Sequence, residues 1–177
     1  SRHPLKQVGQ VVSPTFDRVA GIAVEVDDPA GKYLLVNIHL TTARYGLMNL
    51  MPGALIQDGI SRLESHILER ETEALAVREW IESLDSHLPV ILAGDFNMPV
   101  ESHIFHNSFG DYTNAFESAG WGYGYTAPCQ TRSWPRHCPW ARVDHILCDG
   151  RWSVRSCQVG SQNGSDHRLV AAVLQRR

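Results

Sequence analysis

A short apolar run that ends in an acid and an amide constrains the fold of this chain most. Val90-Ile91-Leu92-Ala93 is bounded by prolines and predicts a buried β-strand. It leads into Gly94-Asp95-Phe96-Asn97, and because side chains alternate along an extended chain, Asp95 and Asn97 point the same way. A carboxylate accepts a proton from water or holds a metal, and an amide orients water or a phosphate oxygen. Taken alone, the pattern is more typical of an ordinary turn.

Related motifs lie on both sides of this stretch. Asn37-Ile38-His39-Leu40 precedes it, and Arg142 to Leu147 and Ser165 to Val170 follow it. The order N-x-H-L, G-D-x-N, R-x-D-x-I, S-D-H-x-x-V resembles the endonuclease/exonuclease/phosphatase superfamily. That group includes pancreatic deoxyribonuclease, exonuclease III-type abasic endonucleases, neutral sphingomyelinases and inositol-polyphosphate 5-phosphatases. One such tetrapeptide is common by chance, whereas the whole set in the family's order, over about Arg18 to Val173, is specific.

The resemblance implies an α/β fold, a four-layer α/β/β/α sandwich with mixed, largely antiparallel sheets. Family members begin with a strand that carries an Asn and continue to a strand with a metal-binding Glu. Neither motif precedes Asn37, and Glu25 lies in the wrong context. We therefore expect one domain over residues 1–177 that lacks the first part of the sandwich, with a leading coil over 1–16. Such a domain exposes an apolar sheet face, which predicts self-association or a completing N-terminal segment.

The resemblance also implies a metal site. Asp166 is the expected metal ligand, together with Asp95, and the expected ion is Mg²⁺ or Mn²⁺ because hard carboxylate oxygens suit these ions. With the family's metal-binding Glu missing, we expect weak metal affinity.

The remaining site roles follow from the same resemblance. His167 contacts the scissile phosphate as general acid, general base or hydrogen-bond donor, and Asp144 pairs with it and fixes its tautomer. Asp95 orients or deprotonates the attacking water. Asn97 holds a phosphate oxygen, and His39 donates a hydrogen bond to another.

The rest of the chain reads as helices and strands that alternate along the sequence. Ser61 to Leu84 has apolar residues at helical spacing, a stripe that Arg70 and Glu71 interrupt, and most of its charged residues are interpreted as a solvated face. Glu101 to Ala119 predicts one or two short helices. The expected strand pairs and the final strand are residues 18–26 with 33–40, residues 142–148 with 152–159, and residues 169–174.

A long loop from Trp121 to Trp140 combines aromatic and basic residues. The candidate substrate-binding residues are Thr126, Arg132, Trp134 and Arg136. Such a mixture can stack a base or a sugar ring and hold phosphates, but it is equally typical of a rigid loop pinned by its own aromatics.

The cysteines fall in the last third of the chain, at Cys129, Cys138, Cys148 and Cys157. Asp149-Gly150 between the last two is a hairpin turn signal, so these cysteines can face each other across two strands. Disulfides and ordinary buried thiols both remain open.

Composition limits the function classes. Hydrophobic residues make up 43% and charged residues 20%, which is ordinary for a globular protein. The net charge of -3 gives no general attraction to nucleic acid. No run reaches the length of a membrane helix and no signal peptide is visible at Ser1, which leaves a cytoplasmic and a secreted location open.

The motifs together predict a divalent-metal-dependent phosphoester hydrolase. A phosphodiesterase or nuclease acting on DNA or RNA is the first choice within the family. A lipid-head-group or small-molecule phosphodiesterase or phosphatase is the alternative, and the acidic net charge slightly favours it. A further alternative is a catalytically impaired relative that acts as a binding module.

Overall fold

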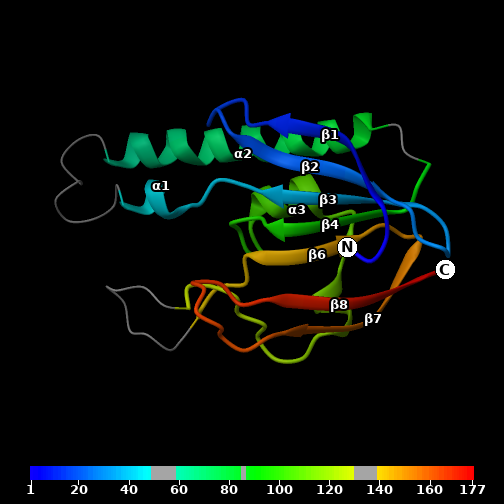
Figure 1. Cartoon of the computed structure of the whole chain (residues 1–177). Helices are drawn as coiled ribbons and strands as arrows, with labels where there is room; N and C mark the ends of the chain where they lie inside the picture. The colour runs from blue at the N-terminus through cyan, green and yellow to red at the C-terminus, as the bar shows by residue number, and fades with distance from the viewer. Residues whose placement is uncertain (49–58, 85–86, 130–138) are drawn as a thin grey trace.

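A six-stranded sheet dominates the computed structural model, which describes residues 1–48, 59–84, 87–129 and 139–177. Its strands lie in the order β1-β2-β3-β4-β6-β5, and β7 and β8 form a separate two-stranded sheet (Figure 1). The bounds are β1 Leu5–Val12, β2 Val19–Val26, β3 Tyr33–His39, β4 Val90–Asp95, β5 Thr113–Asn114, β6 Asp144–Cys148, β7 Trp152–Val159 and β8 Val170–Arg176. Only β3 and β4 pair in parallel among the described strands, which confirms a mixed α/β fold with largely antiparallel strands.

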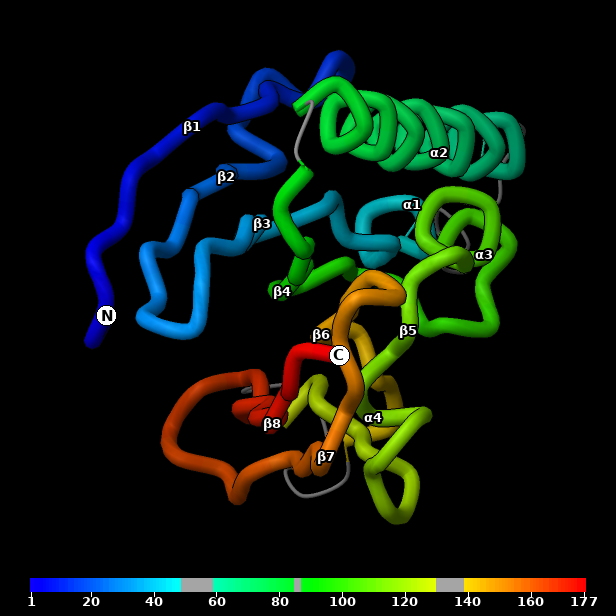
Figure 2. The backbone as a smooth tube through the Cα atoms, turned by 90° about the vertical axis from the view of Figure 1, so that its right-hand side faces the viewer, coloured from blue at the N-terminus to red at the C-terminus, as the bar shows by residue number. Residues whose placement is uncertain are grey.

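The helices that the structure describes lie on both sides of the six-stranded sheet, with the last of them on the side of the second sheet (Figure 2). They are α1 Arg44–Met48, α2 Gly59–Ser83, α3 His103–Phe109 and α4 Ala115–Ala119. Apolar residues of α2 and α3 pack with β3 and β4 in the main core. Figure 2 shows α2 and α3 on one side of this sheet and the β7–β8 sheet on the other. None of the described helices is long and apolar enough to cross a lipid bilayer.

Several expected elements are confirmed. The β2–β3 hairpin pairs Val26 with Tyr33. α2 covers most of the helix expected from Ser61 to Leu84, and α3 and α4 are the short helices expected before Ala119.

The expected leading coil over residues 1–16 is wrong for half of its length. Leu5–Val12 forms β1, which pairs antiparallel with β2. None of its residues is fully buried, because β1 is an edge strand. An edge strand with little core contact has little hydrophobic alternation, so its backbone pairing leaves a weak sequence signal.

The expected pairing of residues 142–148 with 152–159 is also wrong. β6 lies between β4 and β5, while β7 pairs with β8. Asp149 explains the departure, because its carboxylate accepts from the backbone N–H of Val90 at 2.7 Å and its own N–H donates to the Val90 carbonyl at 3.1 Å. These bonds hold the turn against the start of β4, and the chain then continues into β7 of the second sheet.

The cysteines that the structure describes are free thiols. Cys129, Cys148 and Cys157 are all buried, and burial raises the pKa of each thiol. A disulfide between Cys148 and Cys157 is therefore ruled out, because β6 and β7 belong to different sheets. Cys138 lies outside the described residues.

Candidate active site

Strand register gathers the expected site residues at one edge of the six-stranded sheet. Parallel pairing of β3 with β4 sets His39 opposite Asp95. Antiparallel pairing of β4 with β6 sets Asp95 opposite Asp144. Motifs that lie far apart in the sequence thus form one row across three neighbouring strands.

Gly94 makes the close approach of β3 and β4 feasible. Its φ is 145°, a backbone conformation that favours glycine, and a Cβ atom there would lie 1.9 Å from the Ile38 carbonyl oxygen. A side chain at position 94 would therefore push the two strands apart directly beside Asp95.

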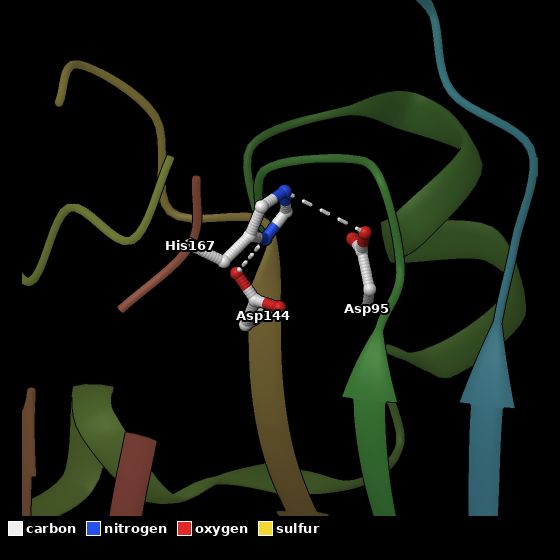
Figure 3. Close-up of side chains that lie close together, drawn as sticks. All are labelled: Asp95, Asp144 and His167. Carbon is white, nitrogen blue, oxygen red and sulfur yellow. Dashed lines mark hydrogen bonds and ion pairs between the residues drawn. The ribbon is translucent and has the colours of Figure 1, made fainter. Parts of the chain in front are cut away.

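His167 completes the row from a different part of the chain. Its Nδ1 donates to Asp144 Oδ2 at 2.8 Å, and its Nε2 lies 4.0 Å from Asp95 Oδ2. Figure 3 shows the imidazole between the two carboxylates, beyond the ends of β4 and β6. A single oxygen atom of a bound molecule can contact both Nε2 and the Asp95 carboxylate, which is the arrangement that proton transfer needs.

Asp144 holds His167 in its charged form. The hydrogen bond from His167 to Asp144 raises the pKa of the imidazole to about 9, although partial burial opposes the shift. At neutral pH His167 is an imidazolium whose Nε2–H is free of the Asp144 bond. Such a group is suited to donate a proton or a hydrogen bond to a phosphoryl oxygen.

Burial raises the pKa of the Asp95 carboxyl, and the nearby Asp144 carboxylate raises it further. The hydrogen bond from the Asn97 backbone N–H to Asp95 Oδ1, 2.8 Å long, works in the opposite direction. Asp95 is therefore a carboxylate of increased basicity, held in a fixed orientation.

Asn97 joins the ends of β3 and β4. Its φ is 51°, and its side-chain Nδ2 donates to the Leu40 carbonyl at 2.8 Å and to Asp95 Oδ2 at 3.0 Å. Both amide protons are used in this way, so contact of Nδ2 with a phosphate oxygen would replace one of these bonds. His39 is exposed at the end of β3.

Thr126 is fully buried and holds the start of β6. Its hydroxyl oxygen accepts from the backbone N–H groups of Val143 at 3.1 Å and Asp144 at 3.3 Å. Its carbonyl accepts from the N–H of Arg168, next to His167. The structure therefore places Thr126 behind the acid–base pair. The other expected substrate-binding residues, Arg132, Trp134 and Arg136, lie outside the described residues.

One group of candidate metal ligands occurs among the described residues, formed by Asp95, Asp144 and His167. Asp166, the expected ligand, is exposed and outside this group, and its carbonyl accepts from the N–H of Cys129. The two neighbouring carboxylates fit Mg²⁺ or Mn²⁺ in donor type. The mutual repulsion that raises the pKa of Asp95 is what a bound cation relieves.

Sequence patterns missed a buried polar cluster on α2. Glu73 is fully buried and Arg70 is 8% exposed, so both are exceptions to the solvated face expected for most charges on this helix. A signal was present: Arg70 lies three residues after Ile67 and four before Ala74, on the apolar stripe itself.

The comparisons with known proteins agree with this geometry. The model of the endonuclease/exonuclease/phosphatase family matches residues 1–167. The chain belongs to this family. No curated protein sequence matches the chain.

Solved structures share the fold at low sequence identity. The Neisseria 3′ phosphatase NExo, solved with product DNA hairpin, is similar at TM-score 0.68 and 18% identity, with 99% of this chain and 73% of that chain covered. Mannosyl-6-phosphatase Bt3783 of Bacteroides thetaiotaomicron gives TM-score 0.60 and 17% identity over 97% and 67%. The human Nocturnin catalytic domain with bound sulfate gives 0.62 and 16% over 99% and 61%. The chain thus spans about two thirds of these proteins.

Proposed function

We propose that this protein is a divalent-metal-dependent phosphoester hydrolase whose acid–base machinery is Asp95, Asp144 and His167. One observation carries the proposal: an imidazolium held by Asp144 lies opposite a partly buried carboxylate, with its Nε2 4.0 Å from Asp95 Oδ2. Phosphoester hydrolysis needs a proton acceptor for water and a donor for the leaving oxygen. This pair supplies both.

The roles follow from the charge of each group. Asp95 accepts the hydrogen bond of the attacking water and takes its proton, since burial favours protonation of this carboxyl. His167 donates from Nε2 to the phosphoryl or leaving oxygen, and Asp144 keeps its ring oriented and charged. A divalent cation, for which the family resemblance implies Asp166 and Asp95 as ligands, would offset the phosphate charge, and the structure groups Asp95 with Asp144 rather than with Asp166.

The substrate we propose first is a phosphodiester of DNA or RNA. A 3′ phosphatase bound to a product DNA hairpin is among the neighbours named above, which supports nucleic acid as the substrate class but not the type of bond, because a 3′-phosphate is a monoester. Exposed aromatics near the site also support a ligand with rings: Tyr123 is 78% exposed and stacks on Tyr125, which precedes Thr126. Trp140 is 61% exposed and adjoins Ala141, whose backbone bonds to Thr126.

A phosphomonoester or lipid-head-group substrate is the second candidate. The mannosyl-6-phosphatase among the neighbours and the net charge of -3 favour it over a long polyanion. The two candidates differ in one respect that an assay detects: only the first predicts cleavage of internal phosphodiester bonds.

Hydrolysis assays test the proposal. Plasmid DNA, bis(p-nitrophenyl) phosphate and p-nitrophenyl phosphate are incubated with Mg²⁺ or Mn²⁺ and, separately, with EDTA. We expect activity that EDTA removes and that His167→Ala and Asp95→Asn lower by about 10²- to 10⁴-fold, the usual contribution of acid–base groups. His103→Ala, which alters an exposed histidine of α3, is the matched control and retains activity.

Two results would contradict the proposal. Wild-type rates in both His167→Ala and Asp95→Asn, with circular dichroism unchanged, would remove these residues from the chemistry. Complete inactivity of the wild type toward all substrates, with nucleic-acid binding that EDTA does not alter, would identify a binding module instead.

A further inference from the structure

An ion pair between the buried Glu73 and the partly exposed Arg18 lies beside the active-site row. Glu73 of α2 is 0% exposed, and its Oε1 accepts from Arg18 Nη2 at 2.8 Å. Arg18 also donates to the carbonyl of His39, the last residue of β3. The pair therefore connects α2 to the strand end that carries His39.

Arg18, Arg70 and Glu73 form a polar cluster that binds Thr41, just after β3. The N–H of Thr41 donates to Glu73 Oε2 at 2.7 Å, and its hydroxyl oxygen accepts from Arg18 Nη2 at 2.6 Å. Its carbonyl accepts from Arg70 Nε at 2.9 Å. Each polar group of Thr41 is thus bonded to the cluster, so the backbone two residues beyond His39 has a fixed position.

Arg70 extends the cluster to the chain after β4. While its Nε bonds Thr41, its Nη2 donates to the carbonyl of Asn97 at 2.9 Å. Asn97 in turn bonds Asp95 through its backbone N–H and its side chain. One guanidinium therefore links the segment that follows His39 to the segment that follows Asp95.

Fold stability alone does not account for these charges. A buried ion pair is weak evidence for stability, because desolvation of the two charges offsets their attraction. Neighbouring positions of α2 that face the same core hold apolar side chains, such as Ala74 and Val77. Charged groups at Arg70 and Glu73 instead give directional bonds to backbone groups of the site.

We infer that Arg70 is a positioning residue of the active site, which holds Asn97 and through it Asp95 in reacting geometry, and that Glu73 supports this arrangement by holding Thr41. This inference rests on the proposed hydrolase function. Misplacing a reacting group by about 1 Å costs up to about 10²-fold in rate. Arg70→Met should therefore lower kcat by about 10- to 100-fold with little change in KM.

Matched variants separate positioning from stability. Arg78→Met is the control, because Arg78 lies on the same helix and donates to a backbone carbonyl, that of Ser108, at 3.2 Å without a link to the site. We expect it to retain kcat. Arg70→Lys should recover only part of the lost rate, because an ammonium cannot reproduce the planar fork that bonds two carbonyls.

A double-mutant cycle tests whether Arg70 acts through Asn97. Asn97→Gly removes the amide, and glycine tolerates the φ of 51°. If Arg70 acts through Asn97, Arg70→Met should lower kcat less in the Asn97→Gly background than in the wild type. An equal fold-loss in both backgrounds would exclude action through the Asn97 side chain, and a wild-type kcat in Arg70→Met would overturn the inference.

A readout independent of activity keeps the two proposals apart. In a ¹⁵N-labelled protein the side-chain amide signal of Asn97 is assigned by its loss in Asn97→Gly. We expect Arg70→Met to shift or broaden this signal and Arg78→Met to leave it unchanged. An inactive wild type whose Asn97 signal responds to Arg70→Met supports the positioning and contradicts only the hydrolase function. An unchanged signal contradicts the positioning.

Discussion

The two sheets differ in how well they are packed. β3 buries Leu34, Val36 and Ile38 in the main core, whereas β8 has no fully buried residue. Among the described residues, the buried members of the core beside β7 and β8 are Ala115, Phe116 and Cys157. The active site joins the two regions, because Asp95 and Asp144 come from the six-stranded sheet and His167 precedes β8. The bond between Asp144 and His167 is therefore a link between a rigid region and a weaker one.

The two regions also differ in the charge of the histidine that each contains. His145 follows Asp144 in β6 and is 2% exposed. Its Nε2 donates to the Met98 carbonyl at 3.0 Å and its Nδ1 accepts from Asn114 at 3.2 Å, so it is satisfied as a neutral ring. Burial lowers its pKa to about 4, whereas the pKa of His167 is raised to about 9. His145, inside the packed six-stranded sheet, is therefore neutral at neutral pH, whereas His167, between the two sheets, is charged.

Removal of the hydrogen bond between Asp144 and His167 has the largest expected effect. Asp144→Asn removes the partner that raises the pKa of His167, so the imidazole should lose its proton near its ordinary pKa of 6.5. Because the protonated form is the donor, kcat of the wild type should fall as pH rises through about 9. In the variant the fall should begin near 6.5, which alone costs about 30-fold at pH 8. Loss of the ring orientation that Asp144 imposes extends the total to about 10²- to 10⁴-fold. A pH–rate profile from 5 to 10 measures both.

The pH at which kcat falls on the alkaline side of the profile decides whether His167 is the proton donor. A limb that stays near pH 9 in Asp144→Asn would show that another group titrates there. Equal thermal midpoints of the two proteins at pH 6 provide the control for folding.

His145 gives the packed sheet its own pH dependence. A folded-state pKa of about 4, below the unfolded value of 6.5, means that the unfolded chain binds the proton more readily. The stabilisation by neutral His145 is fully present above pH 6.5 and is lost as pH falls toward 4. Two and a half pKa units correspond to roughly 3 kcal/mol at most. Urea unfolding at pH 7 and pH 4.5 should show this loss, and His145→Gln should reduce the difference between the two pH values.

The strand-end motifs were predictable because their chemistry is local. Asp95, Asp144 and His167 each follow or begin an apolar run, and the register then brings them together. The family resemblance supplied the pairing of Asp144 with His167, and in the structure the two side chains lie 2.8 Å apart. The β2–β3 hairpin and α2 were predictable for the same reason, since turn residues and helical spacing are short-range signals.

The remaining features depend on partners that sequence patterns do not contain. Asp149-Gly150 is typical of a hairpin, but a bond to Val90, far upstream, directs the chain to another sheet. Arg70 interrupts the apolar stripe, but amphipathic patterns treat most charges as exposed and do not indicate which of them, here Arg70 and Glu73, are buried. Only the positions of Arg18 and Thr41 in space show that these charges are paired.

Hydrogen exchange sharpens the comparison of the two sheets. A two-stranded sheet with little buried apolar surface is marginally stable. Amides in the β7–β8 ladder should therefore open locally, while those of β3 and β4 open only with the whole domain. We expect exchange in β8 to be faster by about 10²-fold or more in native buffer, measured by mass spectrometry of peptic peptides. Equal protection of Val36 and Ala172 would contradict the difference in rigidity.

The smallest expected effect concerns Thr126, which bonds to both regions. Its hydroxyl accepts from the N–H groups at the start of β6, and its carbonyl accepts from Arg168, just before β8. Thr126→Val keeps the shape but leaves two buried donors without their acceptor, which costs about 1–3 kcal/mol of unfolding free energy. Thr126→Ser keeps the oxygen and should cost less. If the valine variant unfolds at the same urea concentration as the serine variant, the hydroxyl does not hold β6, and the placement of Asp144 depends on the strand register alone.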